Sequence, residues 1–202
     1  CRTIRSHFGS SEPVPRATPT SGMRPLTEEE TRQVFEKLQK YLGHNMTQLI
    51  DRQDHTHVFR LHKDRVYYMS EHLLKKAECI ARKNLICCGT QFGKFTHTRK
   101  FRLTITCLDY LARLARYKVW VKSNGEQSFL YGNHIVKAHL RRMTEDTPQN
   151  AGVVIFSEGD VPLGFGAAAR TTDGCRTAGT EQIVVYHQAD IGEYLREEAD
   201  LV

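Results

Sequence analysis

The chain has 202 residues, 40% hydrophobic and 26% charged, which is an ordinary composition for a globular protein of one or two domains. No apolar run approaches the roughly 18 residues that a membrane span needs, and no signal-peptide core is present. The net charge of +6 is unevenly placed, because residues 94–122 hold eight Lys and Arg against one Asp, a local charge of +7. Such a block favours a polyanionic partner, most simply nucleic acid, and the alternative is a solvated surface.

The first 22 residues differ in composition from the rest of the chain. Residues 1–22 are rich in Ser, Pro, Thr and Arg and have almost no apolar periodicity. They cannot bury enough surface to offset the entropy cost of ordering, so we expect a disordered extension. Patterned sequence begins at Met23.

The six cysteines form no C-x-x-C pair and no regular framework. This usage indicates a reduced, intracellular protein, and it gives no basis for a zinc site, so no metal is expected. Cys87 and Cys88 are adjacent in an apolar run expected to form a strand. We expect both to be buried as small hydrophobic residues.

Residues 23–116 predict an N-terminal domain in which helices alternate with strands. Thr27 and Glu30 match a capping box, and the helix that follows should end at Gly43. The other expected elements are a helix at 46–50, strands at 58–61 and 66–69 joined as a hairpin, a helix capped by Ser70 with Leu73, Leu74, Ala77, Ile80 and Ala81 inward, a strand at 85–88, a loop at 89–93, a strand at 101–105 and a helix at 109–115.

Residues 117–202 predict a second, β-rich domain that includes a C-terminal helix. A strand at 117–122 precedes a short helix that stops at Gly132, and a basic strand is expected over 134–142. An apolar strand at 153–156, a turn at 158–160 and the glycine-rich strand at 163–166 follow. Short strands with glycine between them indicate a small, strongly curved β-barrel. No Pro- or Gly-rich linker separates the halves, so we expect them to pack closely.

The sequence gives no positive evidence for an enzyme, and no catalytic residue or cofactor is predicted. Gly164-Phe-Gly166 fits a dinucleotide fingerprint but is followed by turn residues, so the glycines are better explained by a tight bend and close approach of another strand. Gly89 to Lys94 is one residue short of a phosphate loop. Asp190, like the other candidate bases, has no histidine or second carboxylate at an interpretable spacing.

Cationic side chains beside a glycine turn are typical of an RNA-binding face. Lys137, His139 and Arg141 would share one face of the basic strand by period two, with Arg142 pointing away. Tyr131 either stacks on an unpaired base or packs in the core, and the sequence leaves both open. The candidate RNA-binding residues are Lys122, Tyr131, Lys137, His139, Arg141, Arg142, Arg170 and Arg176.

Several segments carry a family resemblance. The order FLYGN, basic strand, GVV and PLGFG resembles the PUA domain, an RNA-binding module. Further segments that carry a resemblance are MRPLTEEET (23–31), FRLHKDRVYY (59–68), GKFTHTRKFRL (93–103), LDYLA (108–112), EQSFLYGNH (126–134), VPLGFG (161–166) and VVYHQADIGEYLR (184–196). Through these segments, residues 23–202 as a whole resemble the nuclear import protein seven family of ribosome-biogenesis factors. His139 and Arg141 depart from the small residues expected there and add bulk beside the helix.

The resemblance implies an N-terminal α/β domain packed on a C-terminal PUA barrel, an α+β fold without catalytic activity. It implies a nucleolar factor that acts on large-subunit precursors, with the PUA domain (117–202) contacting pre-ribosomal RNA and the N-terminal domain (23–116) contacting other assembly factors. We expect a monomer without a membrane partner. Two alternatives stay open: an RNA-modification enzyme or its accessory subunit, and a protein–protein adaptor with a basic face.

Overall fold

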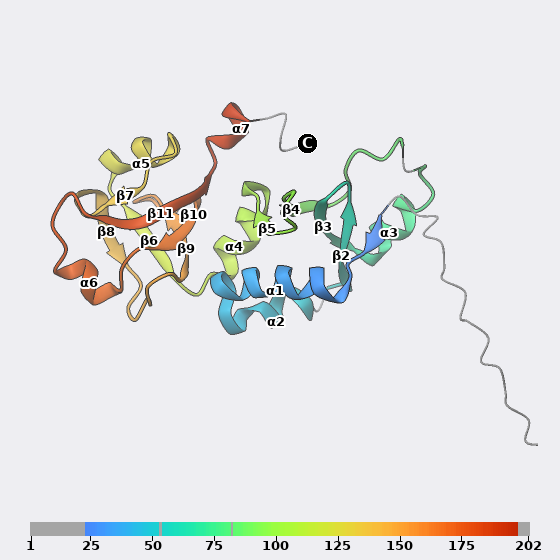
Figure 1. Ribbon diagram of the computed structural model, residues 1–202, viewed down its shortest axis with the longest axis horizontal. Coiled ribbons are helices and arrows are strands. Elements are labelled where there is room, and N and C mark those ends of the chain that lie inside the picture. The colour runs from blue at the N-terminus through green and yellow to red at the C-terminus, as the bar shows by residue number, and fades with distance from the viewer. Residues whose placement is uncertain (1–22, 53, 82, 198–202) are drawn as a thin grey trace, which may run out of the picture.

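The computed structural model describes residues 23–52, 54–81 and 83–197, and the extension expected at 1–22 lies outside them (Figure 1). Two sheets follow one another along the chain, with strand orders β1-β2-β3-β4-β5 and β7-β11-β10-β9-β6-β8. Helices accompany both sheets, so the expected α+β fold class is confirmed. Within the described residues, no helix is both long and apolar enough to cross a membrane.

Figure 1 shows the two sheets at opposite ends of an elongated molecule, with α1 running along the side between them. The N-terminal half contains β1 (Arg24–Pro25), α1 (Glu28–Leu42), α2 (Met46–Ile50), β2 (His57–His62), β3 (Arg65–Ser70), α3 (Glu71–Ala77), β4 (Thr90–Phe95), β5 (Phe101–Leu103) and α4 (Leu108–Leu114). The C-terminal half contains β6 (Lys118–Val121), α5 (Ser123–Leu130), β7 (Ile135–Val136), β8 (Leu140–Met143), β9 (Gly152–Phe156), β10 (Pro162–Ala168), α6 (Thr172–Arg176), β11 (Ile183–Asp190) and α7 (Glu193–Arg196).

The start of α1 is fixed by the predicted capping box. The Glu30 amide donates to Thr27 Oγ1 at 3.3 Å, and the Thr27 amide donates to the Glu30 carboxylate at 3.0 Å. Arg24 adds two hydrogen bonds to the same carboxylate, at 2.7 and 2.8 Å. The hydrogen-bonded guanidinium lowers the pKa of Glu30 to about 2. These contacts tie β1 to the first turn of α1.

The hairpin of β2 and β3 is also where the sequence predicts it. Its two turn residues, Lys63 and Asp64, have φ values of 48° and 63°, the left-handed pair that matches the twist of the flanking strands. Ser70 caps α3 as expected, accepting from the Leu73 amide at 3.3 Å. The expected inward face of this helix is partly wrong. Leu73 lies within α3 but is exposed, and Ile80 and Ala81 are exposed beyond the end of α3 at Ala77.

Two expectations about the segment before β4 are wrong. Residues 85–88 form no strand, and residues 89–93 are not a loop, because β4 begins at Thr90. β3 already has β2 on one side and β4 on the other, so residues 85–88 cannot pair with it, and they pair with neither edge strand of the sheet. Cys87 is exposed and Cys88 half-buried, so neither is the buried residue expected.

The second sheet curves into the nearly closed barrel that the sequence predicts. Its strands pair antiparallel except β6 and β9, which run parallel. A Cβ added at Gly164 would lie 2.3 Å from Ala189 O, and one added at Gly166 would lie 2.2 Å from Tyr186 O. The two glycines therefore permit the close approach of β11, as predicted.

The two halves share one hydrophobic core, which confirms their close packing. Tyr41 of α1 meets the barrel: its ring lies edge-on to Phe165 with centroids 5.5 Å apart, and a Cβ at Gly152 would lie 2.7 Å from it. The Tyr41 hydroxyl donates to Gln188 Oε1 at 2.5 Å, and burial raises the pKa of Tyr41. The core also includes Leu38, Leu42, Leu108 and Leu111 from the first half and Val154, Phe156 and Ala189 from the second.

Replacing Glu30 by Gln should lower the free energy of unfolding by about 1–2 kcal/mol at pH 7, because Arg24 loses a charged partner. The folded-state pKa of Glu30 is depressed, so its stabilising effect is fully present above the ordinary value of 4.5 and is lost as pH falls toward about 2. Urea unfolding between pH 7 and pH 2 should show the difference from wild type shrinking over that interval. Glu36→Gln, in an exposed pair with Arg32, is the matched control. A difference that stayed constant with pH would contradict the assignment.

Tyr41→Ala should destabilise the chain by about 3–5 kcal/mol, because it leaves a cavity between the two halves. Tyr41→Phe should cost about 1 kcal/mol, since it removes only the hydroxyl bonded to Gln188. Chemical denaturation of both variants measures the two effects. Equal losses for the two variants would show that the ring packing between the halves contributes little.

Candidate nucleic-acid interface

The turn after α5 presents an aromatic side chain to solvent. α5 ends at Leu130, and Gly132, with a φ of 87°, donates its amide to Phe129 O at 2.9 Å. Tyr131 is 70% exposed, which places its ring on the surface and not in the core. Among the described residues no heavy atom lies within 4 Å of a Cβ built at Gly132. An exposed ring beside open backbone is suited to stacking on a base.

The basic segment after this turn is not the single strand expected over 134–142. β7 is followed by a 3-10 helix, Lys137–His139, and β8 begins only after it. β7 pairs with β11 and β8 pairs with β6, at opposite ends of the sheet order, so the chain has to turn a corner between them. The expectation that Lys137, His139 and Arg141 share a face by period two is therefore wrong.

His139 packs against α5 and does not block a groove. A Cβ added at Gly125 would lie 2.5 Å from His139 Cβ, so a glycine in α5 makes the room that the imidazole needs. His139 is half-buried as a result. The bulk expected to crowd the space between helix and strand is accommodated at this glycine.

Lys122 and Arg141 lie beside the turn between β9 and β10. Arg141 forms an ion pair with Glu158, and Ser123 Oγ donates to the same carboxylate at 2.8 Å. The hydrogen bond from Ser123 and the charges of Arg141 and Lys122 lower the pKa of Glu158. Lys122 Nζ also donates to Ala138 O at 3.0 Å. A neighbouring carboxylate thus offsets part of the positive charge that the sequence shows here.

Arg142 is held on the same side of the barrel by an aromatic ring. Its guanidinium carbon lies 3.7 Å from the centroid of the Trp120 ring, and the guanidinium is 3.8 Å from Asp160. The Trp120 indole donates to that carboxylate at 2.5 Å. The Arg142 guanidinium therefore already makes a cation–π contact with Trp120 and an ion pair with Asp160.

Lys137, Arg170 and Arg176 belong to a second group near α6. Lys137 and Arg170 lie close enough to Cys175 for their charges to oppose the rise in its pKa that burial causes. Arg176 forms an exposed pair with Asp173 at 3.2 Å. The eight predicted residues thus fall into separate places on the barrel: the Glu158 side, the α6 side, and Tyr131 at its own turn.

A hollow of about 660 Å³ opens beside Arg170, and we call it the Arg170 hollow. It is lined by Gln149, Ala169, Arg170, Thr171, Gly174, Glu181, Gln182, Ile183 and Tyr186. Tyr186 is 45% exposed, and its ring meets that of His134 edge-on with centroids 5.5 Å apart. Sequence reasoning missed Tyr186 and His134. The available signal was the position of Tyr186 directly after the two buried valines of β11.

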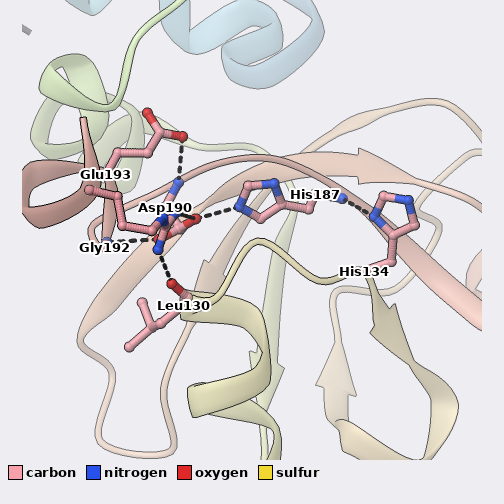
Figure 2. Close-up of polar contacts among 7 residues, drawn as sticks. Leu130, His134, His187, Asp190, Gly192 and Glu193 are labelled. Carbon is pink, nitrogen blue, oxygen red and sulfur yellow. Dashed lines mark hydrogen bonds and ion pairs between the residues drawn. The ribbon is translucent and has the colours of Figure 1, made fainter. Parts of the chain in front are cut away.

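A buried carboxylate at the end of β11 supports the turn after α5 (Figure 2). Asp190 accepts hydrogen bonds from His187 Nε2 at 2.6 Å, the Gly192 amide at 2.7 Å and the Arg196 guanidinium at 2.8 Å. Arg196 also donates to Leu130 O at the C-terminus of α5. The guanidinium therefore joins β11, α7 and the end of α5.

The same network is connected to the Arg170 hollow through the backbone of His187 and the ring of His134, which contacts Tyr186. The His187 amide donates to His134 Nδ1 at 3.2 Å, a contact that Figure 2 also shows. The expectation that Asp190 has no histidine partner is wrong, since His187 precedes it by three residues and their side chains meet. The pairing of β11 with β10 skips Gln188, and this irregularity in the register brings residues three apart together, which an i, i+2 strand pattern does not predict.

Comparison with known proteins relates both halves to one family. Residues 23–105 match the NIP7/UPF0113 pre-PUA domain, and residues 117–199 match the UPF0113 PUA domain. Over 179 residues the chain is 62% identical to the 60S ribosome subunit biogenesis protein nip7 of Schizosaccharomyces pombe and 60% identical to the NIP7 homolog of Mus musculus. Each alignment covers 89% of this chain and 99% of the relative. The chain belongs to the NIP7 family.

Solved structures agree with this NIP7-family fold. A PUA domain protein from Aeropyrum pernix superposes with a TM-score of 0.58 at 15% identity, covering 89% of this chain and 91% of that one. A conserved PUA domain protein from Thermoplasma acidophilum gives a TM-score of 0.52 at 12% identity, covering 87% of this chain and 98% of its own. At such low identity these likenesses establish the fold alone. The resemblance drawn from the sequence is confirmed.

The Asp190 cluster in this NIP7-family chain also has ligand atoms that a cation could bridge. Those of His187, Asp190 and Glu193 lie within 4.8 Å of one another. Arg196 already occupies the Asp190 carboxylate, and its positive charge opposes a bound cation. Burial raises the pKa of Glu193, which disfavours the charged form that a metal requires. The cluster is better suited to a structural role.

Asp190→Ala should destabilise the chain by about 3 kcal/mol, because Arg196 and His187 lose the carboxylate that holds them. Amide exchange at Gly132 should also speed up, since Arg196 would no longer anchor the end of α5. Asp173→Ala is the control, because its pair with Arg176 is exposed and should contribute less than about 0.5 kcal/mol. Unchanged protection at Gly132 in Asp190→Ala would refute the supporting role.

Proposed function

We propose that this protein is a non-catalytic RNA-binding assembly factor for the large ribosomal subunit, acting as a monomer on pre-ribosomal RNA in the nucleolus. The observation that carries the proposal is the family relation, which extends over both halves of the chain. The relatives, at about 60% identity, are named as 60S ribosome subunit biogenesis proteins. The PUA fold supports an RNA ligand, and so does the excess of cations over acids, a net +6.

The RNA face that we assign lies around the turn after α5 and the Arg170 hollow. Tyr131 and Tyr186 offer two exposed rings on which unpaired bases can stack. Arg170 lines the hollow and can bind phosphate in a bidentate manner. Lys137 and Arg176 extend the positive charge toward α6. The Asp190 network supports this assignment, because it holds the turn that carries Tyr131.

Lys122, Arg141 and Arg142 form a weaker part of the same proposal. Glu158 lies beside Arg141, and Asp160 beside Arg142, so phosphate would have to compete with a carboxylate at each position. We assign these three residues to long-range attraction of RNA. His139 contributes less still, because it packs against Gly125.

The N-terminal domain is assigned to protein partners, other assembly factors of the same particles. Its support is a group of exposed apolar side chains around α3, where Leu73 is 39%, Ile80 44% and Ile86 65% exposed. The rival function of an RNA-modification enzyme or its accessory subunit has no comparable support. The Asp190–His187 pair, the best candidate for acid–base chemistry, is occupied by Arg196.

Ultraviolet crosslinking of the tagged protein in growing cells tests the proposal. We expect pre-ribosomal RNA of the large subunit to be recovered, with crosslinks at the segment around Tyr131. Tyr131→Ala should weaken binding of purified protein to single-stranded RNA by roughly tenfold, the effect of losing one stacked base, as measured by fluorescence anisotropy.

Tyr131→Phe keeps the ring and should bind like wild type, which separates stacking from loss of the hydroxyl. Because Tyr131 is exposed, both variants should retain the melting temperature of wild type. Recovery of only messenger or transfer RNA would contradict the assembly role. Equal binding by Tyr131→Ala and wild type would place the stacking site elsewhere.

A further inference from the structure

Much of the chain's basic block lies on the N-terminal sheet and not on the PUA barrel. Lys94 is at the end of β4, Arg102 is in β5, and Arg99 and Lys100 are in the turn between them. Arg99, Lys100 and Arg102 are exposed, and Lys94 is half-buried. These four residues, here called the cationic hairpin, have no role in the function proposed above.

Strand register lines up cations across this sheet. Lys94 pairs directly with Arg65 of β3 on one side and with Arg102 of β5 on the other. Residues directly opposite on neighbouring strands point to the same face, so three positive side chains stand in a row. Like charges in that arrangement repel one another, and a bound polyanion would reduce that repulsion. The row therefore concentrates positive charge on one face of the N-terminal sheet.

Two hollows meet at Lys94. The first, of about 540 Å³, lies at the tip of the hairpin and is lined by Asp64, Lys94, Phe95, Thr96, His97 and Arg99. The second, of about 450 Å³, is an inter-domain cleft. Lys94 and Arg102 line it from the N-terminal sheet, and Tyr131, Gln188 and Arg196 are among the residues that line it from the barrel. The two hollows, which share Lys94 and extend from Arg99 at the hairpin tip to Tyr131 on the barrel, are here called the track.

Lys94, Arg99, Arg102 and Arg196 are the Lys and Arg side chains that line the two hollows, and Arg196 is also paired with Asp190. Among the described residues, Arg99 and Arg102 take part in none of the ion pairs, in contrast to Arg141 and Arg142 on the barrel. The acidic side chains that line the two hollows are Asp64, Glu193 and Glu197.

We propose that the cationic hairpin and the inter-domain cleft bind the phosphate backbone of a single-stranded RNA segment that continues from the base stacked on Tyr131. The N-terminal domain is then a second RNA-contacting surface as well as a protein-binding one. Single-stranded RNA fits better than an acidic peptide, because the track ends at an exposed aromatic ring at which a base can stack. The inference rests on the proposed function in that the strand is RNA.

The test is the double variant Arg99→Ala/Arg102→Ala of the full chain, with labelled oligouridine as the probe. Each lost phosphate contact should reduce the slope of log affinity against log salt concentration by about 0.7, so we expect a slope shallower by about 1.4 and weaker binding at every salt concentration. The control is Arg32→Ala/Lys75→Ala, which removes the same charge from exposed helix pairs and should leave the slope unchanged. Thermal melting verifies that both variants are folded.

Each outcome separates this inference from the function proposed above. A slope equal to wild type in Arg99→Ala/Arg102→Ala, with RNA still bound, overturns the hairpin track alone. If the wild-type protein binds no oligouridine, both the proposed RNA-binding function and the hairpin track are refuted. A third measurement uses polyglutamate: if the double variant loses polyglutamate binding while keeping its RNA slope, the partner is an acidic protein and the proposal is wrong.

Discussion

The packing of Tyr41 between the two halves is the contact on which the rest of the molecule depends. The ring fills the space over Gly152 and meets Phe165 of the barrel, and its hydroxyl reaches Gln188 on β11. A shared core of this kind does not allow the halves to move as tethered domains. The walls of the inter-domain cleft come from the N-terminal sheet and from the barrel, so this packing sets their relative position.

The Asp190 network supports the barrel side of that cleft. It holds α7 against β11 and fixes the end of α5, so the turn with Tyr131 stands at the rim of the cleft. A fully buried carboxylate is costly unless charged donors satisfy it, and Arg196 and His187 do so here. The position of the exposed ring is thus a consequence of a buried charge cluster a few residues away.

Local sequence signals predicted the fold well where the structure is local. The capping box at Thr27, the turn at Lys63 and Asp64, and the glycines of β10 each specify backbone geometry within a few residues, and each was found as expected. Segments whose conformation depends on distant partners were predicted wrongly. Residues 85–88 look like a strand but pair with no strand of the sheet.

The candidate site shows the same division. Tyr131 and Gly132 were predicted from the helix stop, and their exposed turn is present. The face shared by Lys137, His139 and Arg141 was not, because the corner between β7 and β8 exists only once β11 and β6 supply their pairing edges. A period-two prediction assumes that the whole segment pairs with one neighbouring strand. In this barrel its first part, β7, pairs with β11, and its last part, β8, pairs with β6.

Counting cations along a sequence says little about where a polyanion binds, because the fold decides which charges keep an acidic neighbour. Arg141 and Arg142 meet Glu158 and Asp160 only through the β9–β10 turn. Strand pairing aligns Lys94 with Arg65 and Arg102, which concentrates positive charge on the N-terminal sheet. Under the proposed function, the N-terminal hairpin should therefore contribute to the attraction of RNA together with the barrel. In this molecule the domain whose fold supports RNA binding and the hairpin with the aligned cations are on opposite sides of one cleft.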